Sequence, residues 1–266
     1  MTLVVACDKM TIMIAEHEPP PFEIVRPEGR SRVILCCDHA SHRVPAALET
    51  LGLSEADRLT HIGWDIGAAQ VARRLSELLD ATLVLSSYSR LVVDCNRPLH
   101  VPGVIPVSSG GVKIPGNEGL SEAARARRID AIHRPYHAAI DAALDARARG
   151  ARPPVLLSIH SFTPELLGVR RPWQISLLYG RDVRLAHRFR DALRRDASLN
   201  VGDNEPYHVS DETDFTVPVH GERRGILHTA FEIRQDGVAR PEDARRWAER
   251  LAAIWLELEP SLREEA

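Results

Sequence analysis

The sequence predicts an α/β fold, a single three-layer domain with a mostly parallel or mixed central sheet. Segments typical of strands alternate with segments of helical periodicity along most of the chain, an order that favours a sheet covered by helices. The runs at residues 33–37 and 155–160 are almost wholly apolar, as expected for strands that are buried on both faces. We expect residues 1–266 to form this one domain, with residues 1–30 as an irregular N-terminal arm that contains at most a short strand.

The first half of the chain predicts a βαβ unit. After strand 33–37, the segment from Gly67 to about Asp80 has apolar residues at i, i+3, i+4 and i+7, the spacing of an amphipathic helix. Residues 82–85 are rich in β-branched and aliphatic side chains and predict a second strand parallel to the first. We expect the connection between the two strands to be right-handed.

The remaining elements follow from the same patterns and from turn residues. In order, we expect a short helix capped by Ser54, a short strand at residues 91–93, a long loop at 99–119, a helical stretch at 121–149, a loop at 164–173, a strand at 174–178, a helix at 182–195, a long polar loop at 202–225, a strand at 226–233 and a helix at 241–258. Pro135 lies inside the helical stretch, which predicts a kink or two abutting helices near His133.

Composition and charge exclude several classes of function. The formal net charge of -3 gives no support for nucleic-acid binding through a basic surface. Apolar runs fall far short of the roughly 20 residues that a membrane span needs, and the N-terminus lacks the pattern of a signal peptide. We therefore expect a cytoplasmic protein, a monomer or small homo-oligomer, that acts on a small molecule and not on nucleic acid or a membrane.

Polar side chains suited to chemistry stand where predicted strands end. Strand 33–37 leads into His39 and His42, and the strand that begins at residue 155 delivers His160. In open α/β sheets, ligands bind beyond the carboxyl ends of the strands, so these histidines indicate a metal or catalytic site. Further polar residues near predicted strand ends are Asp38, Asp65, Arg90, Asp94, Asn96, Arg97, Glu232 and Arg234.

Two histidines and a carboxylate are a common ligand set of catalytic zinc, which keeps a fourth position open for water. Zinc in such a site lowers the pKa of water and polarises a carbonyl group. The sequence contains neither the HExxH helix of many metalloproteases nor the GxSxG turn of serine hydrolases. Arginines near strand ends suit a substrate carboxylate, because the guanidinium group makes bidentate contacts.

Seven short blocks between about residues 33 and 236 match the motifs of one known family. The blocks are DHAS from Asp38, WDIGA from Trp64, YSR from Tyr88 continuing to DCNRP at 94–98, RPYH from Arg134, SIHSFTP from Ser158, GDNEPY from Gly202 and FEIRQ from Phe231. In this order and spacing the chain resembles the N-formylglutamate amidohydrolase family. The resemblance implies a fold similar to that of zinc carboxypeptidases.

The resemblance also implies an activity and a metal site. It implies hydrolysis of the amide of an N-formyl or N-acyl amino acid with Zn²⁺ or another divalent metal, first of all N-formyl-L-glutamate to formate and glutamate, a step of histidine degradation. His39 and His160 match the two strand-end histidines that hold the metal in this family. Asp65 stands where better-known members carry a histidine, which makes it the third ligand, with His42 as the competing one.

The same resemblance assigns the remaining site residues. Glu232 matches the general base, and Arg90 and Arg97 match catalytic cations near it. The substrate-binding positions that it implies are Arg90, Asn96, Arg97, His137 and Arg234. Residues 213–216 and 220–224 replace a Gly-Gly-Tyr stretch of better-known members, so the substrate range can differ. Two alternatives stay open, a deacylase or carboxypeptidase-like hydrolase of other N-acyl amino acids, and a non-catalytic binding protein on the same fold.

Overall fold

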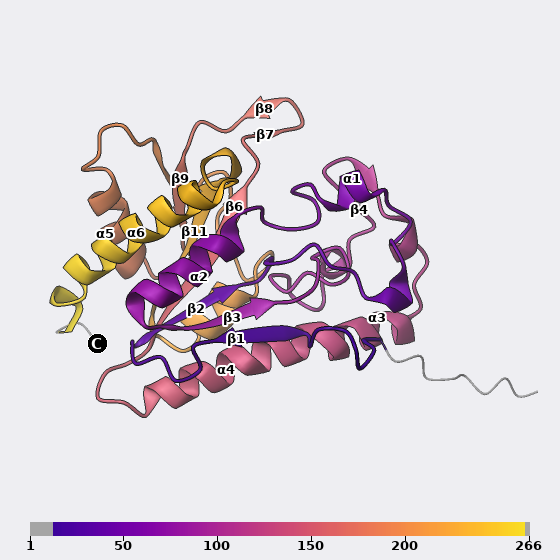
Figure 1. Ribbon diagram of the computed structural model, residues 1–266, viewed down its shortest axis with the longest axis horizontal. Coiled ribbons are helices and arrows are strands. Elements are labelled where there is room, and N and C mark those ends of the chain that lie inside the picture. The colour runs from indigo at the N-terminus through magenta and orange to yellow at the C-terminus, as the bar shows by residue number, and fades with distance from the viewer. Residues whose placement is uncertain (1–12, 264–266) are drawn as a thin grey trace, which may run out of the picture.

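The computed structural model describes residues 13–263, so residues 1–12 of the expected N-terminal arm lie outside the described part (Figure 1). Among the described residues, a seven-stranded mixed sheet has the order β1-β3-β2-β6-β11-β9-β10. Its strands are β1 (Phe22–Val25), β2 (Val33–Cys37), β3 (Thr82–Ser86), β6 (Val155–Phe162), β9 (Ile175–Leu178), β10 (Val201–Asp203) and β11 (Leu227–Arg234). The central strands β3, β2, β6 and β11 are parallel, β1 and β9 are antiparallel to their neighbours β3 and β11, and β10 is parallel to β9.

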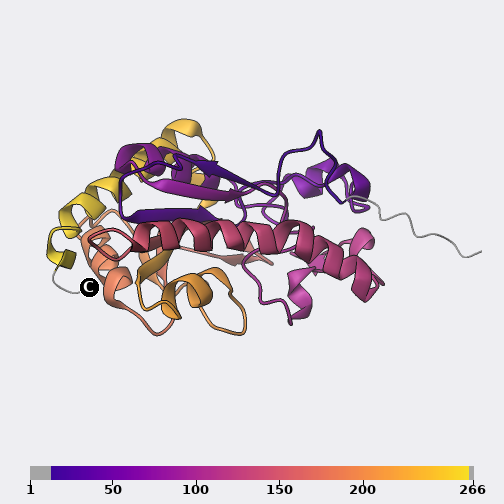
Figure 2. The same ribbon diagram turned by 90° about the horizontal axis from the view of Figure 1, so that it is seen from below.

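Helices cover both faces of the sheet, which gives the three layers that the sequence predicts. The helices are α1 (Glu55–Arg58), α2 (Ala68–Leu79), α3 (Glu122–Arg128), α4 (Arg134–Ala148), α5 (Arg184–Leu193) and α6 (Pro241–Leu258). In Figure 1, α2 and α6 lie above the sheet and α4 runs below it, and Figure 2 shows α4 in front of the strands when the molecule is seen from below. The fold class that we expected is therefore confirmed.

Two buried clusters explain why the central strands are apolar throughout. Successive side chains of a strand point to opposite faces. Val33 and Leu35 therefore pack with α2, α5 and α6, whereas Ile34 and Cys36 pack with α4 on the other face. All five residues of β2 are buried. A strand covered on both faces needs apolar residues at every position, and this is the pattern by which the sequence predicts it.

The predicted βαβ unit is present as β2, α2 and β3, with β2 and β3 adjacent and parallel. Gly67 begins α2 with a φ of 82°, a left-handed conformation that favours glycine. A Cβ atom at Gly67 would lie 2.3 Å from the carbonyl oxygen of Val238, so the close approach of two chain segments also requires glycine there. The fold thus requires, for steric reasons, the glycine that the sequence shows at the start of this helix.

The expected strand at residues 91–93 is wrong, although the three side chains are buried as a strand would bury them. Leu91 and Val92 form a turn, and their carbonyl groups accept hydrogen bonds from side chains instead of from a neighbouring strand. Asn117 Nδ2 donates to the carbonyl of Leu91 at 2.8 Å, and Arg128 Nη1 donates to that of Val92 at 3.2 Å. Apolar residues indicated burial here, but the partners of the backbone lie in distant segments.

Other segments add local detail to the predicted order. The kink near Pro135 takes the form of a π-helical turn, Ile129–His133, between α3 and α4. The arm contains β1, and the expected loops contain the short pairs β4 (Ser108–Ser109) with β5 (Val112–Lys113) and β7 (Glu165–Leu166) with β8 (Val169–Arg170). The polar loop before β11 includes β10 and a π-helical turn, Val217–Glu222.

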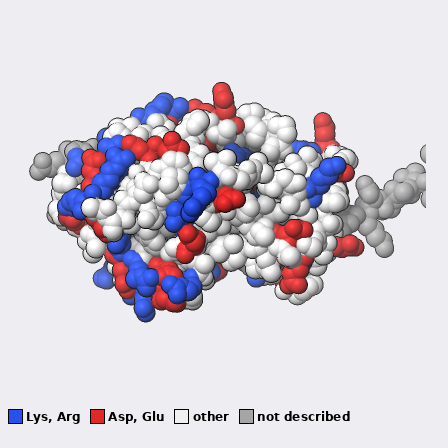
Figure 3. Space-filling model, turned by 90° about the horizontal axis from the view of Figure 1, so that it is seen from above, with Lys and Arg blue, Asp and Glu red and all other residues white. Residues whose placement is uncertain are grey.

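Within residues 13–263, none of the helices combines the length and the apolar character that a membrane crossing requires. On the face shown in Figure 3, acidic and basic side chains are interspersed and do not form one basic patch.

Candidate metal centre

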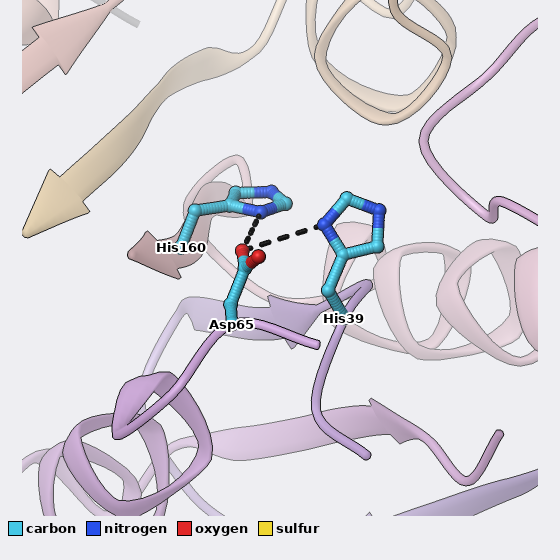
Figure 4. A group of neighbouring side chains, drawn as sticks. All are labelled: His39, Asp65 and His160. Carbon is cyan, nitrogen blue, oxygen red and sulfur yellow. Dashed lines mark hydrogen bonds and ion pairs between the residues drawn. The ribbon is translucent and has the colours of Figure 1, made fainter. Parts of the chain in front are cut away.

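His39, Asp65 and His160 meet at the carboxyl ends of the central strands. His39 follows β2, His160 lies in the neighbouring strand β6, and Asp65 precedes α2. Figure 4 shows the Asp65 carboxylate between the two rings, with its Oδ2 atom 2.8 Å from His160 Nδ1 and 3.3 Å from His39 Nδ1. One donor atom from each residue lies within 4.8 Å of the others, and all three residues are buried. The geometry suits a single metal ion.

The outer nitrogen of each ring is held by a further carboxylate. His39 Nε2 lies 2.7 Å from Asp94 Oδ1, and His160 Nε2 lies 3.0 Å from Asp38 Oδ2. These contacts fix the orientation of both rings, so that the two Nδ1 atoms face Asp65. Histidines that bind metals usually donate the other ring N–H to a carboxylate in this way, which raises their basicity as ligands.

The two outer carboxylates are themselves held by hydrogen bonds. Asp38 accepts hydrogen bonds from the Tyr136 and Thr216 hydroxyl groups, both at 2.8 Å. Arg90 donates to Asp94 at 3.0 Å and to Asp65 at 3.4 Å. The arrangement therefore extends beyond the three inner residues into groups that come from four separate parts of the chain.

Electrostatics favour a cation at this point. Burial alone would raise the pKa of Asp65, but His39 and His160 outweigh it and hold the pKa well below the ordinary range. In the same way, Arg90 and His39 hold the pKa of Asp94 well below its ordinary value against the effect of burial. Burial alone would lower the pKa of His160. The hydrogen bonds to Asp38 and Asp65 raise it by more, so the pKa of His160 lies well above its ordinary value. Ionised carboxylates thus surround two imidazoles, and a divalent cation fits this donor set.

Glu232 lies beside His160 because β11 and β6 pair in parallel with these two residues in register. It is only 8% exposed, lines the same cavity, and its Oε2 atom has no hydrogen-bond partner within the described part of the chain. Burial raises the pKa of this carboxyl to about 7, with a further contribution from the charge of Asp65. A buried carboxyl with an unpaired oxygen and a pKa near 7 is suited to accept and return a proton.

A cavity of about 430 Å³ opens above these groups, a volume within the range of small-molecule sites. Its walls are formed by residues from β6, β9 and β11 and from the loop that precedes the second π-helical turn, Val217–Glu222. The residues that line it are His39, His61, Asp65, Arg90, Asn96, Arg97, Ser109, Gly110, Ser158, His160, Ser161, Phe162, Thr163, Leu166, Leu178, Pro206, Tyr207, His208, Val209, Thr213, Asp214, Val217, Ala230, Glu232 and Gln235.

Most of the chain matches the sequence profile of a known protein family. The sequence profile of the family described as N-formylglutamate amidohydrolase matches residues 31–239, well over half of the 266 residues. The chain belongs to the N-formylglutamate amidohydrolase family. The resemblance stated from the sequence blocks is thus confirmed, and membership indicates a hydrolase that acts on amides.

Two solved structures are similar over nearly the whole chain. A gene product of Agrobacterium tumefaciens is 36% identical with a TM-score of 0.90, covering 94% of this chain and 99% of that one. The N-formylglutamate amidohydrolase of Ralstonia eutropha is 19% identical with a TM-score of 0.67, covering 93% of this chain and 100% of that one, so the two proteins share a fold. No curated protein matches.

Three further residues that the family resemblance assigns to the site line the cavity. Arg90 is bound by Asp65 and Asp94, as described above. Arg97 lies 3.8 Å from Asp94 through Nε and donates a hydrogen bond to the carbonyl of Thr213. The side-chain amide of Asn96 donates to Asp214 at 3.1 Å and accepts from the backbone N–H groups of residues 215 and 216. These bonds tie Asn96 to the loop that forms one cavity wall.

Three other expected site residues do not line the cavity. The ring of His42 packs edge-on against Trp64 with its centroid 5.1 Å away, and it is not part of the cluster of His39, Asp65 and His160 that could hold a metal ion. His137 contacts His220 Nε2 at 2.8 Å and the carbonyl of Cys95 at 2.7 Å. Arg234 donates to the carbonyl groups of residues 171 and 172, so its charge supports the loop after β8.

The sequence does not assign a role to several residues in or around the site. Asp38 and Asp94 were noted as strand-end carboxylates, but nothing in the sequence indicated which nitrogen of which histidine each one holds. Gln235 belongs to the FEIRQ block, and its Nε2 atom is buried beside the cavity with no hydrogen-bond partner within the described residues. The family block was the one signal for Gln235, because a glutamine after a strand is otherwise unremarkable in a sequence.

Proposed function

We propose that this protein is a zinc-dependent amidohydrolase that cleaves the amide bond of N-formyl or N-acyl amino acids. The observation that carries the proposal is the cluster of His39, Asp65 and His160. A further carboxylate contacts the Nε2 atom of each ring, and the oxygen of Glu232 that has no hydrogen-bond partner among the described residues lies beside the cluster. Family membership supports the amide as the bond that is cleaved.

The residues at the centre fit a zinc ion. His39 and His160 offer nitrogen donors through Nδ1 once the metal displaces the proton from that atom, and Asp65 offers an oxygen, a set of three that zinc prefers in catalytic sites, while other divalent metals accept the same donors. Zinc bound there would polarise the amide carbonyl and lower the pKa of a water molecule. Asp38 and Asp94 would keep the two imidazoles in the orientation and tautomer that binding requires.

Glu232 supplies proton transfer in this proposal. Its carboxylate takes a proton from the attacking water and then gives it to the nitrogen of the leaving amine. A pKa of about 7 suits both steps, since the group is then neither a strong acid nor a strong base near neutral pH. Its position in the cavity beside His160 supports a role at the reacting centre other than that of a metal ligand.

The two arginines have different parts in the proposal. Arg90 holds Asp65 and Asp94 in place through its two terminal nitrogens. Arg97 is the more exposed of the two and lines the cavity, so it meets the carboxylate of the substrate or the oxygen that becomes negative during attack. Asn96 positions the loop wall against which the substrate lies.

The test is hydrolysis measured against metal content. N-formyl-L-glutamate, the compound in the name of the family, is the reference substrate, and release of formate is followed in a coupled assay with N-acetyl and longer N-acyl amino acids beside it. We expect activity that disappears on full chelation and returns with Zn²⁺. Activity that survives removal of all metal, or its absence from the zinc-loaded protein on every substrate of the panel, contradicts the proposal.

A further inference from the structure

One wall of the cavity is apolar and separate from the main cores of the protein. Leu178, Val209, Val217 and Ala230 form a small buried cluster of their own. All four line the cavity that contains the metal-binding group. Their exposed fractions lie between 3% and 8%, so each retains a little accessible surface beside the reacting groups.

Strand register places this wall directly next to Glu232. Ala230 precedes Glu232 by two residues on β11 and therefore points to the same face of the sheet. Ala230 pairs with Ser158 on β6 and with Leu178 on β9, just as Glu232 pairs with His160 and Ser176. The row Ser158–Ala230–Leu178 thus lies one pleat below the row that holds the proton-transfer group and a metal ligand.

The small side chain of Ala230 leaves room in the middle of that row. Val209, from the loop after β10, and Val217, from the π-helical turn Val217–Glu222, pack in the same buried cluster and line the same cavity. A substrate whose amide lies at Glu232 therefore has an apolar recess within reach of the adjoining atoms.

The charges around the cavity argue against a second substrate carboxylate in this recess. The two arginines that line the cavity, Arg90 and Arg97, both pair with Asp94. A carboxylate placed against Ala230 and Leu178 would lose its hydration without gaining a cationic partner, which is costly. Asp214 also lines the cavity and adds a negative charge to its wall. An aliphatic group gains free energy on burial at the same place.

We propose that the recess formed by Leu178, Val209, Val217 and Ala230 is the subsite for an aliphatic group of the substrate, so that the preferred substrates are N-acyl amino acids with an aliphatic chain and not N-formyl-L-glutamate. This inference rests on the proposed function. The aliphatic group of the substrate is either its amino-acid side chain or its acyl group, and both present the same apolar chemistry to the recess.

Three substrates separate the two sources and test the preference. The zinc-loaded protein is assayed with N-formyl-L-norleucine, with N-hexanoylglycine and with N-formyl-L-glutamate. Each buried methylene should raise kcat/KM about fourfold, so we expect at least one aliphatic substrate to exceed N-formyl-L-glutamate tenfold or more. Norleucine as the better substrate assigns the recess to the side chain, and hexanoylglycine assigns it to the acyl group. A kcat/KM for N-formyl-L-glutamate equal to or above both overturns the inference.

Variants of the wall test whether the recess itself causes the preference. Ala230→Val fills the middle of the recess and should lower the ratio of kcat/KM between the preferred aliphatic substrate and N-formylglycine at least tenfold. Val209→Thr, on a loop and nearly equal in volume, should lower the same ratio severalfold if the strand variant does not fold. The matched control is Val183→Thr, an exposed valine before α5 that does not line the cavity. Unchanged ratios in a folded wall variant overturn the inference.

A binding measurement separates failure of the inference from failure of the proposed function. Calorimetric titration of the zinc-loaded protein with hexanoate and with glutarate requires no turnover, and both probes carry a carboxylate. We expect hexanoate to bind at least tenfold more tightly, and Ala230→Val to reduce this difference. If no amide is hydrolysed but this difference holds, the proposed reaction is wrong and the subsite stands. If glutarate binds as tightly as hexanoate, the subsite is wrong whatever the activity.

Discussion

Neutralising Glu232 should stabilise the metal-free protein, and the gain should depend on pH. The carboxyl is buried, one of its oxygens has no hydrogen-bond partner among the described residues, and burial raises its pKa from 4.5 to about 7. A raised carboxyl pKa means that the folded state disfavours the ionised form. The group therefore costs no stability while it is protonated in both states, below about pH 4.5, and its full cost appears above about pH 7.

The size of the effect follows from the shift. A difference of about 2.5 pKa units at about 1.4 kcal/mol each corresponds to about 3 kcal/mol at pH 8, and to less than about 1 kcal/mol at pH 5. Glu232→Gln keeps the shape of the protonated side chain but cannot ionise. For a chain of this length we expect the variant to unfold on the order of 5–10 °C higher than the parent at pH 8, with a much smaller difference at pH 5.

The assay is thermal unfolding of the chelated proteins, parent and variant, followed by circular dichroism at several pH values. Glu118→Gln is the matched control, because it removes the same charge from an exposed position. The control should show little difference at either pH. Two results would refute the view that the ionised carboxylate of Glu232 destabilises the folded protein. One is a Glu232→Gln protein that unfolds at no higher temperature than the parent at pH 8, and the other is an increase in unfolding temperature at pH 5 as large as that at pH 8.

The remaining predictions concern the metal and the reaction. Glu232→Gln should retain zinc by elemental analysis yet lose about 10²-fold or more in kcat, because the group transfers protons and is not a ligand; a turnover equal to that of the parent would assign the base elsewhere. His39→Ala should lose zinc and activity together, since a ligand is removed; zinc retained at full stoichiometry would contradict the ligand set. Asp94→Asn should weaken zinc binding about 10- to 100-fold in a competition titration, because His39 loses its supporting carboxylate; unchanged affinity would show that Asp94 does not tune the site.

The layers of the fold follow from the sequence because burial on both faces leaves a plain signal. The apolar runs of β2 and β6 and the helical spacing of α2 identify the centre of the domain, and the strand-end position of His39 and His160 indicates where the candidate metal site lies. Position along a strand fixes both the face and the end of the sheet that a side chain reaches. For this reason the pattern of strands in the sequence was enough to predict that His39 and His160, which are 121 residues apart, lie close together.

The features that the sequence did not settle depend on contacts between distant loops. Val92 looks like part of a strand, but its carbonyl is bound by the side chain of Arg128, which a local pattern does not reveal. His42 and Asp65 are both suitable as a third ligand by residue type, and the path of the chain after β2 brings Asp65, and not His42, beside His39 and His160. The apolar wall joins a π-helical turn and a loop to two strands, so no periodicity marks it.

The central claim is that His39, Asp65 and His160 together bind one divalent metal. The most direct measurement is a crystal structure of the zinc-loaded protein with anomalous scattering data collected on both sides of the zinc absorption edge. We predict a single strong peak within about 2.0–2.2 Å of Nδ1 of both histidines and of a carboxylate oxygen of Asp65. A peak that contacts His42 in place of Asp65, or the absence of any peak among these three residues at full zinc loading, would contradict the account.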